Sequence, residues 1–543
     1  MNQISTVAPF EAPILQPRLM TAAQRQAEEA AMEQKIQELE AKRLVAETAE
    51  IFFPGLLKDR PQEAFEEAAR LILKLEPLNR RFAIALIEGR TVVLDMYSVQ
   101  PPRADSLNSA VVDATLPRAF PTALEFRALT NLHMATQVRV HKKTEGEMNI
   151  ADAWLHWPGH RKYARGIVFS PGVAQEDLPG DRLNLFTGWG IPPQDPDHKA
   201  DVEACSLFLH HLRFVICGGD EAVYQWLLWW CADILQNPRS KPGSAVVLAG
   251  KKGSGKSFVA DVLREIIGPK YFVRVSKKKD LVGEFNAHFA AALLVNCEEA
   301  TFGGDIEANN TLKDMITSEY TIVNEKFMPR QNMRSYSRFI FTTNSDYSHS
   351  TSEDERRFLF LDVGSQFCGD TAYFDRMAGQ LDRGGYQALA NLLHSMKRPD
   401  GVNLRKPPRT EAHTRLFAES LSIEERFFYN AAVTGEGFPE AAEAEGGIVF
   451  VSDVKAAFDA YIDDHAKGRS FKRSDNNFVP ACMQKFWGVD PESWNRKTRN
   501  RRKEVCYEVP SLRNAREWLA MPTTDGGLGL SRHAVGLDEG EEG

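Results

Sequence analysis

Short apolar runs followed by polar turns dominate the central part of the chain. Four of them cover residues 244–249, 291–296, 338–342 and 358–361, and each is four to six residues long. Unbroken apolar runs of this length are typical of strands that are buried on both faces of a parallel sheet. Residues 256–267 instead carry apolar side chains at helical spacing. The pattern predicts an α/β core with a parallel sheet.

The residues before this core follow other patterns. Residues 22–50 are rich in Ala, Glu, Gln, Lys and Arg and carry apolar side chains at loosely helical spacing, which predicts an amphipathic helix. This helix is either a coiled-coil collar or a solvated helix docked on its own domain. Residues 82–89, 91–97 and 166–171 are strand-like pieces separated by proline-rich turns, which favours a small α/β accessory domain.

The C-terminal part returns to helical spacing. We expect a helix over residues 452–465, a second helix starting at residue 474 or 475 and ending at 486, and a last helix over 511–519. Between them, residues 496–503 and 504–509 alternate as the two strands of a short hairpin. Two helices, a hairpin and a helix favour a winged-helix-like domain, and a lid-like helical domain is the alternative.

This organisation divides the chain into segments that exceed a single domain. They are an N-terminal segment with the amphipathic helix (1–77), the small α/β accessory domain (78–183), a helical region leading into the core (184–240), the α/β core (241–365), a helical lid-like region (366–433), a linker (434–447), the winged-helix-like basic domain (448–520) and a disordered acidic tail (521–543).

The formal net charge of −8 conceals a segregated distribution. The last six residues contain four acids, whereas residues 466–503 hold eleven Lys and Arg against three acids. The overall sign therefore says little about partners, and the basic segment is a candidate surface for nucleic-acid phosphates. A merely solvated surface is the alternative. The candidate contacts are Lys472, Arg473, Arg496, Lys497, Arg499, Arg501 and Arg502.

Several signals are missing from the sequence. No apolar run reaches the roughly 18 residues of a membrane span, and the N-terminus lacks the layout of a signal peptide. The seven cysteines never fall two to four residues apart, so no zinc-binding spacing is present. We expect a cytoplasmic protein of a bacterial host cell, with no membrane partner and with buried, reduced cysteines.

The segment Gly250–Ser257 reads GKKGSGKS and follows an apolar strand directly. Small residues let backbone N–H groups close around a triphosphate, and the N-terminus of the next helix favours the anion. Lys256 is predicted to reach the outer phosphates and Ser257 to ligate Mg²⁺. The expected ligands are therefore ATP, or another nucleoside triphosphate, and Mg²⁺. The remaining contacts are assigned to Gly250, Gly253, Ser254 and Gly255.

Three further polar groups stand at the ends of the other predicted strands. We assign Glu298 to the metal and Glu299 to the attacking water, although the two roles could be reversed. Asn344 could hydrogen-bond the γ-phosphate or the water, and Arg356 and Arg357 could stabilise charge on a transferring phosphoryl group. Taken singly, these groups could also be solvated glutamates, a turn and a local salt-bridge cluster.

The order and spacing of these groups resemble the superfamily-three viral helicases. Residues 184–361 are similar to phage and plasmid primase–helicase proteins, whose helicase half belongs to the AAA+ ATPases. The matching pieces are NLFTGW at 184–189, ICGGDEAVYQWLLWWCADILQNP at 216–238, GKKGSGKS at 250–257, CEEA at 297–300, LKDMITSE at 312–319, FTTN at 341–344 and ERRF at 355–358.

The resemblance implies hexameric rings that translocate on nucleic acid while they hydrolyse NTP at subunit interfaces. It assigns Lys256 to the Walker A motif with Ser257, Glu298 and Glu299 to the Walker B motif, and Asn344 to the sensor. It also implies that Arg356 or Arg357 acts in trans, on the nucleotide of a neighbouring subunit.

Residues 321–337 have β-prone ends around a centre that contains Pro and Asn. This pattern suits the hairpin that such helicases point into the ring channel. Its cations, Lys326, Arg330 and Arg334, could grip phosphates without reading bases. An ordinary solvated hairpin is the alternative.

The similar proteins often carry a primase or polymerase domain ahead of the helicase. The first 180 residues here offer no pair of metal-binding carboxylates on adjacent strands, because Asp95 and Asp113 are isolated. Primer synthesis by this chain is therefore not expected, and a separate primase or polymerase is a candidate partner.

These features predict an NTP-driven, ring-forming helicase of phage or mobile-element replication that acts on single-stranded or forked DNA. Two other classes stay open. An ATP-dependent initiator or loader would use ATP only to assemble on nucleic acid, and Glu299 with the arginine pair argues against it. A packaging motor or regulatory ATPase should lack the basic hairpin and the winged helix.

Overall fold

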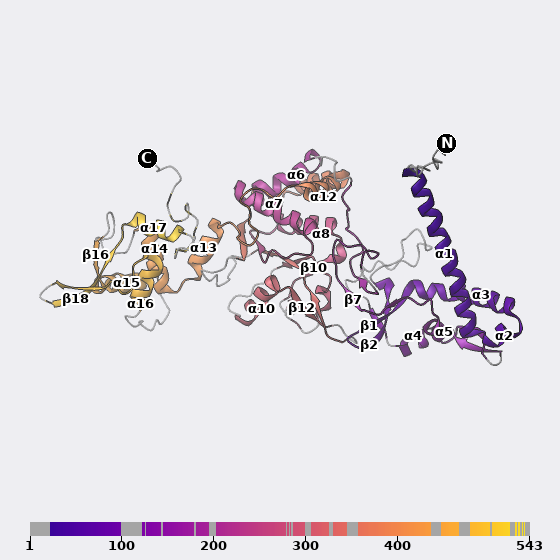
Figure 1. The fold of residues 1–543 in the computed structure, drawn as a ribbon. Coiled ribbons are helices and arrows are strands. Elements are labelled where there is room, and N and C mark those ends of the chain that lie inside the picture. The colour runs from indigo at the N-terminus through magenta and orange to yellow at the C-terminus, as the bar shows by residue number, and fades with distance from the viewer. Residues whose placement is uncertain are drawn as a thin grey trace, which may run out of the picture. The chain divides into compact units, whose positions relative to one another are not determined.

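The structure is a computed structural model that divides into two compact units (Figure 1). The first unit comprises Met1–Ile84, Val92–Met96 and Leu124–Lys162, and the second comprises Ala85–Thr91, Tyr97–Ala123 and Tyr163–Gly543. The structure describes residues 22–98, 122–124, 126–142, 145–178, 181–194, 202–277, 280–281, 283, 286–298, 306–324, 329–344, 357–435, 447–465, 478–499, 502–521, 527, 528, 530, 532, 535 and 537.

The first unit consists mainly of helices around one apolar core. Its elements are α1 (Ala22–Phe52), α2 (Pro54–Asp59), α3 (Pro61–Arg81), α4 (Phe126–Leu132), α5 (Ile150–His156) and a hairpin of β4 (Gln137–His141) and β5 (Glu145–Asn149). The core contains Phe52, Leu75 and Trp154, all fully buried. The helix predicted over residues 22–50 is confirmed as α1, but its apolar residues Met32, Ile36 and Leu39 are exposed.

The predicted domain limit at residue 77 is corrected by the structure. Pro77 lies inside α3, which continues to Arg81. Leu75 and Leu78 on α3 belong to the same core as Phe82 and Trp154. The helices before residue 77 and part of the region after it therefore fold together, because the apolar face of α3 is buried against both.

The strand-like pieces of the accessory region have different outcomes. Two of them form β1 (Phe82–Ile87) and β2 (Arg90–Asp95), and η1 (Met96–Ser98) follows; the sheet order is β3-β2-β1-β6, with β3 at Thr122–Leu124 and β6 at Lys162–Tyr163. The third piece yields only β7 (Ile167–Val168), which pairs with β8 (Leu183–Asn184). It stays short because Gly166 has a φ of 77° and the side chain of Asn184 bonds the backbone of Ser170.

A parallel sheet forms the centre of the second unit, as predicted, and it has a fifth strand, β10, that the sequence did not predict. Its strands are β9 (Ala245–Ala249), β10 (Phe272–Val275), β11 (Leu294–Glu298), β14 (Arg338–Thr343) and β15 (Phe358–Asp362), in the order β10-β11-β14-β9-β15. Strand β11 starts later than the predicted residue 291, because a helical turn, η6 (Ala287–Phe289), leads into it. All five strands end at one edge of the sheet, which we call the carboxyl edge.

Helices cover both faces of this sheet. One face packs against α10 (Ile306–Thr317) and α13 (Glu411–Ser420) through Leu312, Ile316 and Leu416. Figure 1 shows α7 (Glu221–Gln236), α8 (Lys256–Ile267) and α12 (Tyr386–Ser395) on the side away from α10. Shorter segments complete this part: η3 (Val202–Cys205), α6 (Ser206–His210), η4 (His211–Ile216), η5 (Pro269–Tyr271), α11 (Thr371–Gln380) and η7 (Leu381–Gly385).

The predicted hairpin between residues 321 and 337 is present. Strand β12 (Tyr320–Val323) pairs antiparallel with β13 (Gln331–Arg334). The centre of this hairpin, including Lys326, lies outside the described residues.

The C-terminal helices predicted over residues 452–465 and 511–519 are confirmed, and the described part of the second helix starts at Phe478, because its predicted start at 474 or 475 lies outside the described residues. The elements are α14 (Ile423–Thr434), β16 (Gly447–Phe450), α15 (Val451–His465), α16 (Phe478–Trp487), β17 (Asn495–Arg499), β18 (Arg502–Val509) and α17 (Leu512–Ala520), with sheet order β16-β18-β17. The register of the hairpin is corrected: Arg499 pairs with Arg502, so the chain reverses between them rather than at 503–504. With this register the buried Tyr507 and Val509 of β18 reach the core beside Phe486.

Three further observations concern the described residues. None of the helices has both the length and the apolar character needed to cross a membrane. All seven cysteines are free thiols. Six of them are buried, as expected from the sequence, whereas Cys368 is half-buried. Within the described ranges, no group of three or more His, Cys, Asp or Glu side chains is arranged to hold a metal ion.

Candidate functional site

The glycine-rich loop joins the carboxyl end of β9 to the first turn of α8. Gly250, Gly253 and Gly255 have φ angles of 156°, 81° and 92°, in the region that favours glycine. A Cβ at Gly255 would lie 2.5 Å from Nε2 of His211, and one at Gly250 would lie 2.9 Å from the carbonyl oxygen of Val363. Both glycines are therefore required by backbone angle and by space.

Lys256 is the central cation of this loop. Its Nζ donates to the carbonyl oxygens of Gly250 (2.6 Å) and Lys251 (2.8 Å) and to Oδ1 of Asn344 (3.1 Å). The side chain is buried, at 6% exposure, although an ammonium group is costly to remove from water unless acceptors surround it. The loop carbonyls and Asn344 thus hold the charge at the carboxyl edge of the sheet.

A cavity of about 510 Å³ opens beside this lysine. The sequence predicted four of its groups from three different strand ends, and the structure brings them together. Glycine-loop residues, Ser257, Glu298 and Asn344 all line it, and Thr371 and Phe374 of α11 close another side. Its volume lies within the range of pockets that hold small-molecule ligands.

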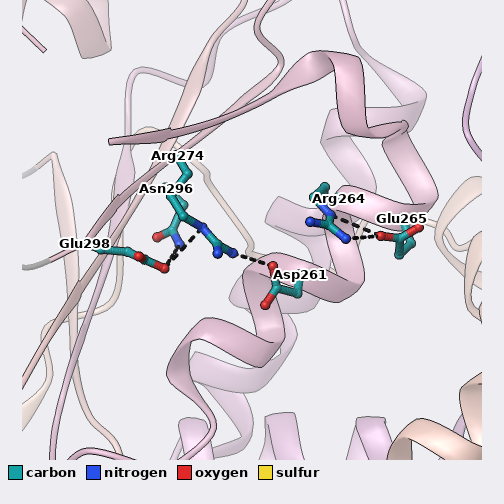
Figure 2. Close-up of polar contacts among 6 residues, drawn as sticks. All are labelled: Asp261, Arg264, Glu265, Arg274, Asn296 and Glu298. Atoms are coloured by element: carbon teal, nitrogen blue, oxygen red, sulfur yellow. Dashed lines mark hydrogen bonds and ion pairs between the residues drawn. The ribbon is translucent and has the colours of Figure 1, made fainter. Parts of the chain in front are cut away.

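Glu298 has a partner that the sequence did not reveal. Oε1 of Glu298 lies 3.2 Å from Nε of Arg274 on β10 and accepts a hydrogen bond from Asn296. Arg274 also pairs with Asp261 on α8, so an arginine links the end of β11 to the helix that follows the glycine loop (Figure 2). Glu298 therefore lines the cavity, as a metal ligand would, but its carboxylate is already paired with Arg274. The assignment of Glu298 to the metal stays a prediction.

Two further neighbours of the loop were missed at the level of sequence. His211 is fully buried between the loop and α11, and its Nδ1 lies 3.2 Å from the hydroxyl of Tyr373. Burial lowers the pKa of His211 to about 4, so this imidazole is neutral at pH 7. No local motif marks His211 or Thr371, because both come from segments far from the loop in sequence.

Arg357 does not lie near the cavity beside Lys256. It immediately precedes β15, whose first residue, Phe358, pairs with Ala245 at the start of β9. The glycine loop leaves the other end of β9, so Arg357 and the loop lie at opposite edges of the sheet. Glu299 and Arg356, the other predicted catalytic residues, lie outside the described residues.

The predicted nucleic-acid contacts fall in two places. Arg330 and Arg334 lie on the β12–β13 hairpin, and the guanidinium of Arg334 lies 5.6 Å from the ring centroid of Tyr320. On β17 and β18, Arg496, Lys497 and Arg502 are exposed. Arg499 is paired with Asp453 and is less available for a phosphate. Lys326, Lys472, Arg473 and Arg501 lie outside the described residues.

The part of the chain that contains the glycine loop, Glu298 and Asn344 matches a known family model. Residues 248–357, from the end of β9 to Arg357, match the model of DUF5906, a family of unknown function. A stretch of 139 residues is 26% identical to the DNA primase-polymerase of Nitratiruptor phage NrS-1. This match covers 25% of the present chain and 19% of the relative, so it spans about a fifth of the length of that curated protein.

Solved structures give a longer match. Two apo structures of the NrS-1 C-terminal region, one of them an A form, align over 80% of this chain and 97% of theirs, with a TM-score of 0.50 and 14% identity. At this identity the likeness concerns the fold, which is mixed α/β with a parallel sheet and many helices.

Proposed function

We propose that this chain is an NTP-driven DNA helicase of phage replication. The observation that carries the proposal is the single cavity in which the glycine loop, Ser257, Glu298 and Asn344 meet. The stretch similar to a phage DNA primase-polymerase supports the replication context. The sheet supports the nucleotide site, because ligands of open parallel sheets bind beyond the carboxyl ends of the strands.

The chain's own residues suit a bound triphosphate. The loop amides and the N-terminus of α8 would face the phosphates, where backbone donors and the helix dipole favour negative charge. Lys256 would exchange its carbonyl acceptors for phosphate oxygens, with Asn344 kept beside it. Ser257 and Glu298 would hold Mg²⁺, which neutralises charge on the phosphates.

In this proposal the motor is a ring of several copies, as in the hexameric helicases that the sequence resembles. Arg357 lies at the edge of the sheet opposite its own glycine loop, so it could act only on the nucleotide of another copy. Hydrolysis at such shared interfaces would couple NTP turnover to movement along single-stranded DNA.

A strand-displacement assay on forked DNA with either tail polarity, with and without ATP, tests the proposal. We expect ATP-dependent unwinding from one polarity only. The matched pair Lys256→Ala and Lys251→Ala separates the buried loop lysine from an exposed lysine in the same loop. Wild-type protein that binds forked DNA but neither hydrolyses ATP nor separates the strands would exclude a helicase.

One observation favours a second candidate, an ATP-dependent initiator or loader. The carboxylate of Glu298 is already paired with Arg274, and Lys256 is engaged by its own loop. Both contacts would slow turnover if they persisted with nucleotide bound. A loader should assemble on DNA in ATP without unwinding it, and size-exclusion chromatography with a nonhydrolysable analogue distinguishes this outcome.

A further inference from the structure

A second cavity, of about 690 Å³, lies at the amino edge of the parallel sheet, where the strands begin. Its wall is formed by the turn before β9, the end of β13, the residue before β15 and the turn after α12. Among the described residues, its lining contains six cationic side chains and one carboxylate, that of Glu319. The six cations are Arg239, Lys241, Arg334, Arg357, Arg405 and Lys406.

Among the described residues, little negative charge balances the cations other than Arg357. Arg334 lies 4.0 Å from Glu319, at the limit of an ion pair. Lys241 donates only to neutral oxygens, including the carbonyls of Met315 (2.7 Å) and Ser318 (2.8 Å). Arg239, Arg405 and Lys406 make no side-chain hydrogen bond or ion pair within the described ranges. A concave surface lined by one sign of charge concentrates the field and attracts counter-ions.

The turn before β9 is held rigidly by a buried ion pair. Arg338 is fully buried, and its Nη2 lies 2.7 Å from Oδ2 of Asp233 on α7. The same nitrogen donates to the carbonyl oxygens of Asn237 (3.1 Å) and Ser240 (2.8 Å). The buried guanidinium of Arg338 therefore fixes the backbone of the turn that carries Arg239 and Lys241.

The turn after α12 is equally well supported. The indole Nε1 of Trp226 donates to the carbonyl oxygen of Asn403 (3.0 Å), and Oδ1 of Asn403 accepts from the backbone N–H of Arg405. The backbone N–H of Lys406 donates to the carbonyl of Asn403. Arg405 and Lys406 are thus exposed on an ordered turn, so less ordering cost is required when an anion binds them.

We propose that this basic cavity binds the backbone phosphates of a single nucleic-acid strand. The inference deepens the proposed helicase function and rests on it, and it adds Arg239, Lys241, Arg405 and Lys406, which belong to no recognised motif. A free phosphate would need only a compact set of donors, whereas these cations come from separate segments around an open cavity.

The neighbouring hairpin supports a strand as the ligand. Tyr320 is 49% exposed, and Arg334, which lines the cavity, lies over its ring. Exposed aromatic rings beside a cationic groove are typical of surfaces that bind single strands without reading their sequence. Burial, and then the charge of Arg338, lower the pKa of Lys241 to about 8.

The test compares two double variants that lose the same charge. Arg405→Ala/Lys406→Ala removes two cavity cations, and Arg383→Ala/Lys397→Ala removes two exposed cations outside the cavity lining. Fluorescence anisotropy with oligo-dT and oligo-dA is measured over a series of salt concentrations. For the cavity variant we expect weaker binding of both oligonucleotides and a log–log salt slope reduced by about 0.7 per lost contact, or about 1.4 in total.

A localised measurement accompanies the titration. Acetylation of lysines in the full-length protein, read by mass spectrometry, should show protection of Lys406 by oligo-dT and no protection of Lys397. A fluorescent ATP analogue should bind the cavity variant as it binds the wild type, because the glycine loop is at the other edge of the sheet.

Each other outcome has a definite meaning. Wild-type protein that binds no oligonucleotide would remove the DNA part of the proposed function. Wild-type binding with equal salt slopes for both double variants would overturn the cavity inference and leave the proposed function standing. If the cavity variant loses nucleotide binding and keeps DNA binding, the cavity is a polyphosphate site, and the inference is also wrong.

Discussion

The two edges of the parallel sheet use charge in opposite ways. At the carboxyl edge, Lys256 is buried and its ammonium is satisfied by loop carbonyls and Asn344. At the amino edge, Arg239, Arg405 and Lys406 have no side-chain partner among the described residues, and backbone contacts instead fix the turns that carry them.

This difference indicates different ligands. At the carboxyl edge, a single cation lies inside a loop whose backbone groups can also bind a ligand. Such a site suits a ligand of defined shape, such as a nucleoside triphosphate. A site with several extended cations around an open cavity suits a polymer whose phosphates repeat and whose position shifts. In these proposals the nucleoside triphosphate and the nucleic-acid strand bind at opposite edges of the same sheet.

The largest effect is expected from Arg338 at the amino edge. Arg338→Met leaves Asp233 buried without its counter-ion and removes the donor to the turn before β9. Breaking a buried ion pair from one side costs about 3–5 kcal/mol of stability. Chemical denaturation followed by tryptophan fluorescence measures this loss, because Trp226 and Trp230 lie on the same helix as Asp233.

The double variant Asp233→Leu/Arg338→Met is the control for this prediction. Removing both charges avoids the unpaired carboxylate, so part of the lost stability should return. A double variant that is no more stable than Arg338→Met would show that the ion pair is not what holds this turn.

The next effect concerns Lys256 at the carboxyl edge. Lys256→Ala should lower ATP turnover by about 10²–10³-fold, because a preorganised cation is lost from the phosphates. Lys251→Ala, with an exposed side chain in the same loop, should stay near the wild-type rate. Steady-state phosphate release measures both. Loss of DNA binding by Lys256→Ala in the absence of nucleotide would contradict the separation of the two edges.

The sequence predicted the carboxyl edge better than the amino edge. Helix α8 begins and ends at the predicted residues, and β9, β14 and β15 lie within one residue of their predicted limits. These elements are marked by local signals: apolar runs, glycines and a helix that starts at the motif. Their order along the chain also suggested which side chains would meet.

The amino-edge cavity could not be predicted in the same way. Arg239, Arg357 and Arg405 are more than forty residues apart from one another in sequence and meet only through the packing of α7, α12 and the sheet. The pairing of Arg274 with Glu298 was hidden for the same reason, because it depends on β10 lying next to β11. Single-sequence patterns carry no signal for such tertiary neighbours.

An acid titration sharpens the description of the carboxyl edge. The pKa of His211 is lowered by burial from 6.5 to about 4, so the folded state favours the neutral imidazole. Stability from this group is complete above pH 6.5 and is lost as the pH falls towards 4, because the unfolded chain then binds the proton more readily. The free energy of unfolding should fall by about 3 kcal/mol over this window.

The difference between variants isolates this group from other histidines. Burial also lowers the pKa of His413, to about 3, so the wild type should lose further stability in acid. His211→Gln should show a smaller loss between pH 6.5 and 4 than the wild type. His210→Gln, at the exposed neighbouring position, should show the wild-type loss. Identical pH profiles for wild type and His211→Gln would mean that the imidazole is not held neutral.

The smallest effect concerns the ion pair between Arg274 and Glu298 at the carboxyl edge. Arg274 and Glu298 are 40% and 26% exposed, and ion pairs of this kind contribute at most about 1 kcal/mol. If Arg274 competes with Mg²⁺ for Glu298, Arg274→Met should lower the Mg²⁺ concentration for half-maximal binding of an ATP analogue by up to about fivefold. Isothermal titration at fixed ionic strength measures this shift.

Arg264→Met is the matched control, because Arg264 lies on α8 and pairs with Glu265 rather than with Glu298 (Figure 2). It should leave the Mg²⁺ requirement unchanged. A higher Mg²⁺ requirement in Arg274→Met would instead mean that Arg274 orients Glu298 for the metal, and the competition argument would fail. Glu298→Gln adds the decisive arm: if Arg274 acts through this carboxylate, adding Arg274→Met to Glu298→Gln should change nothing further.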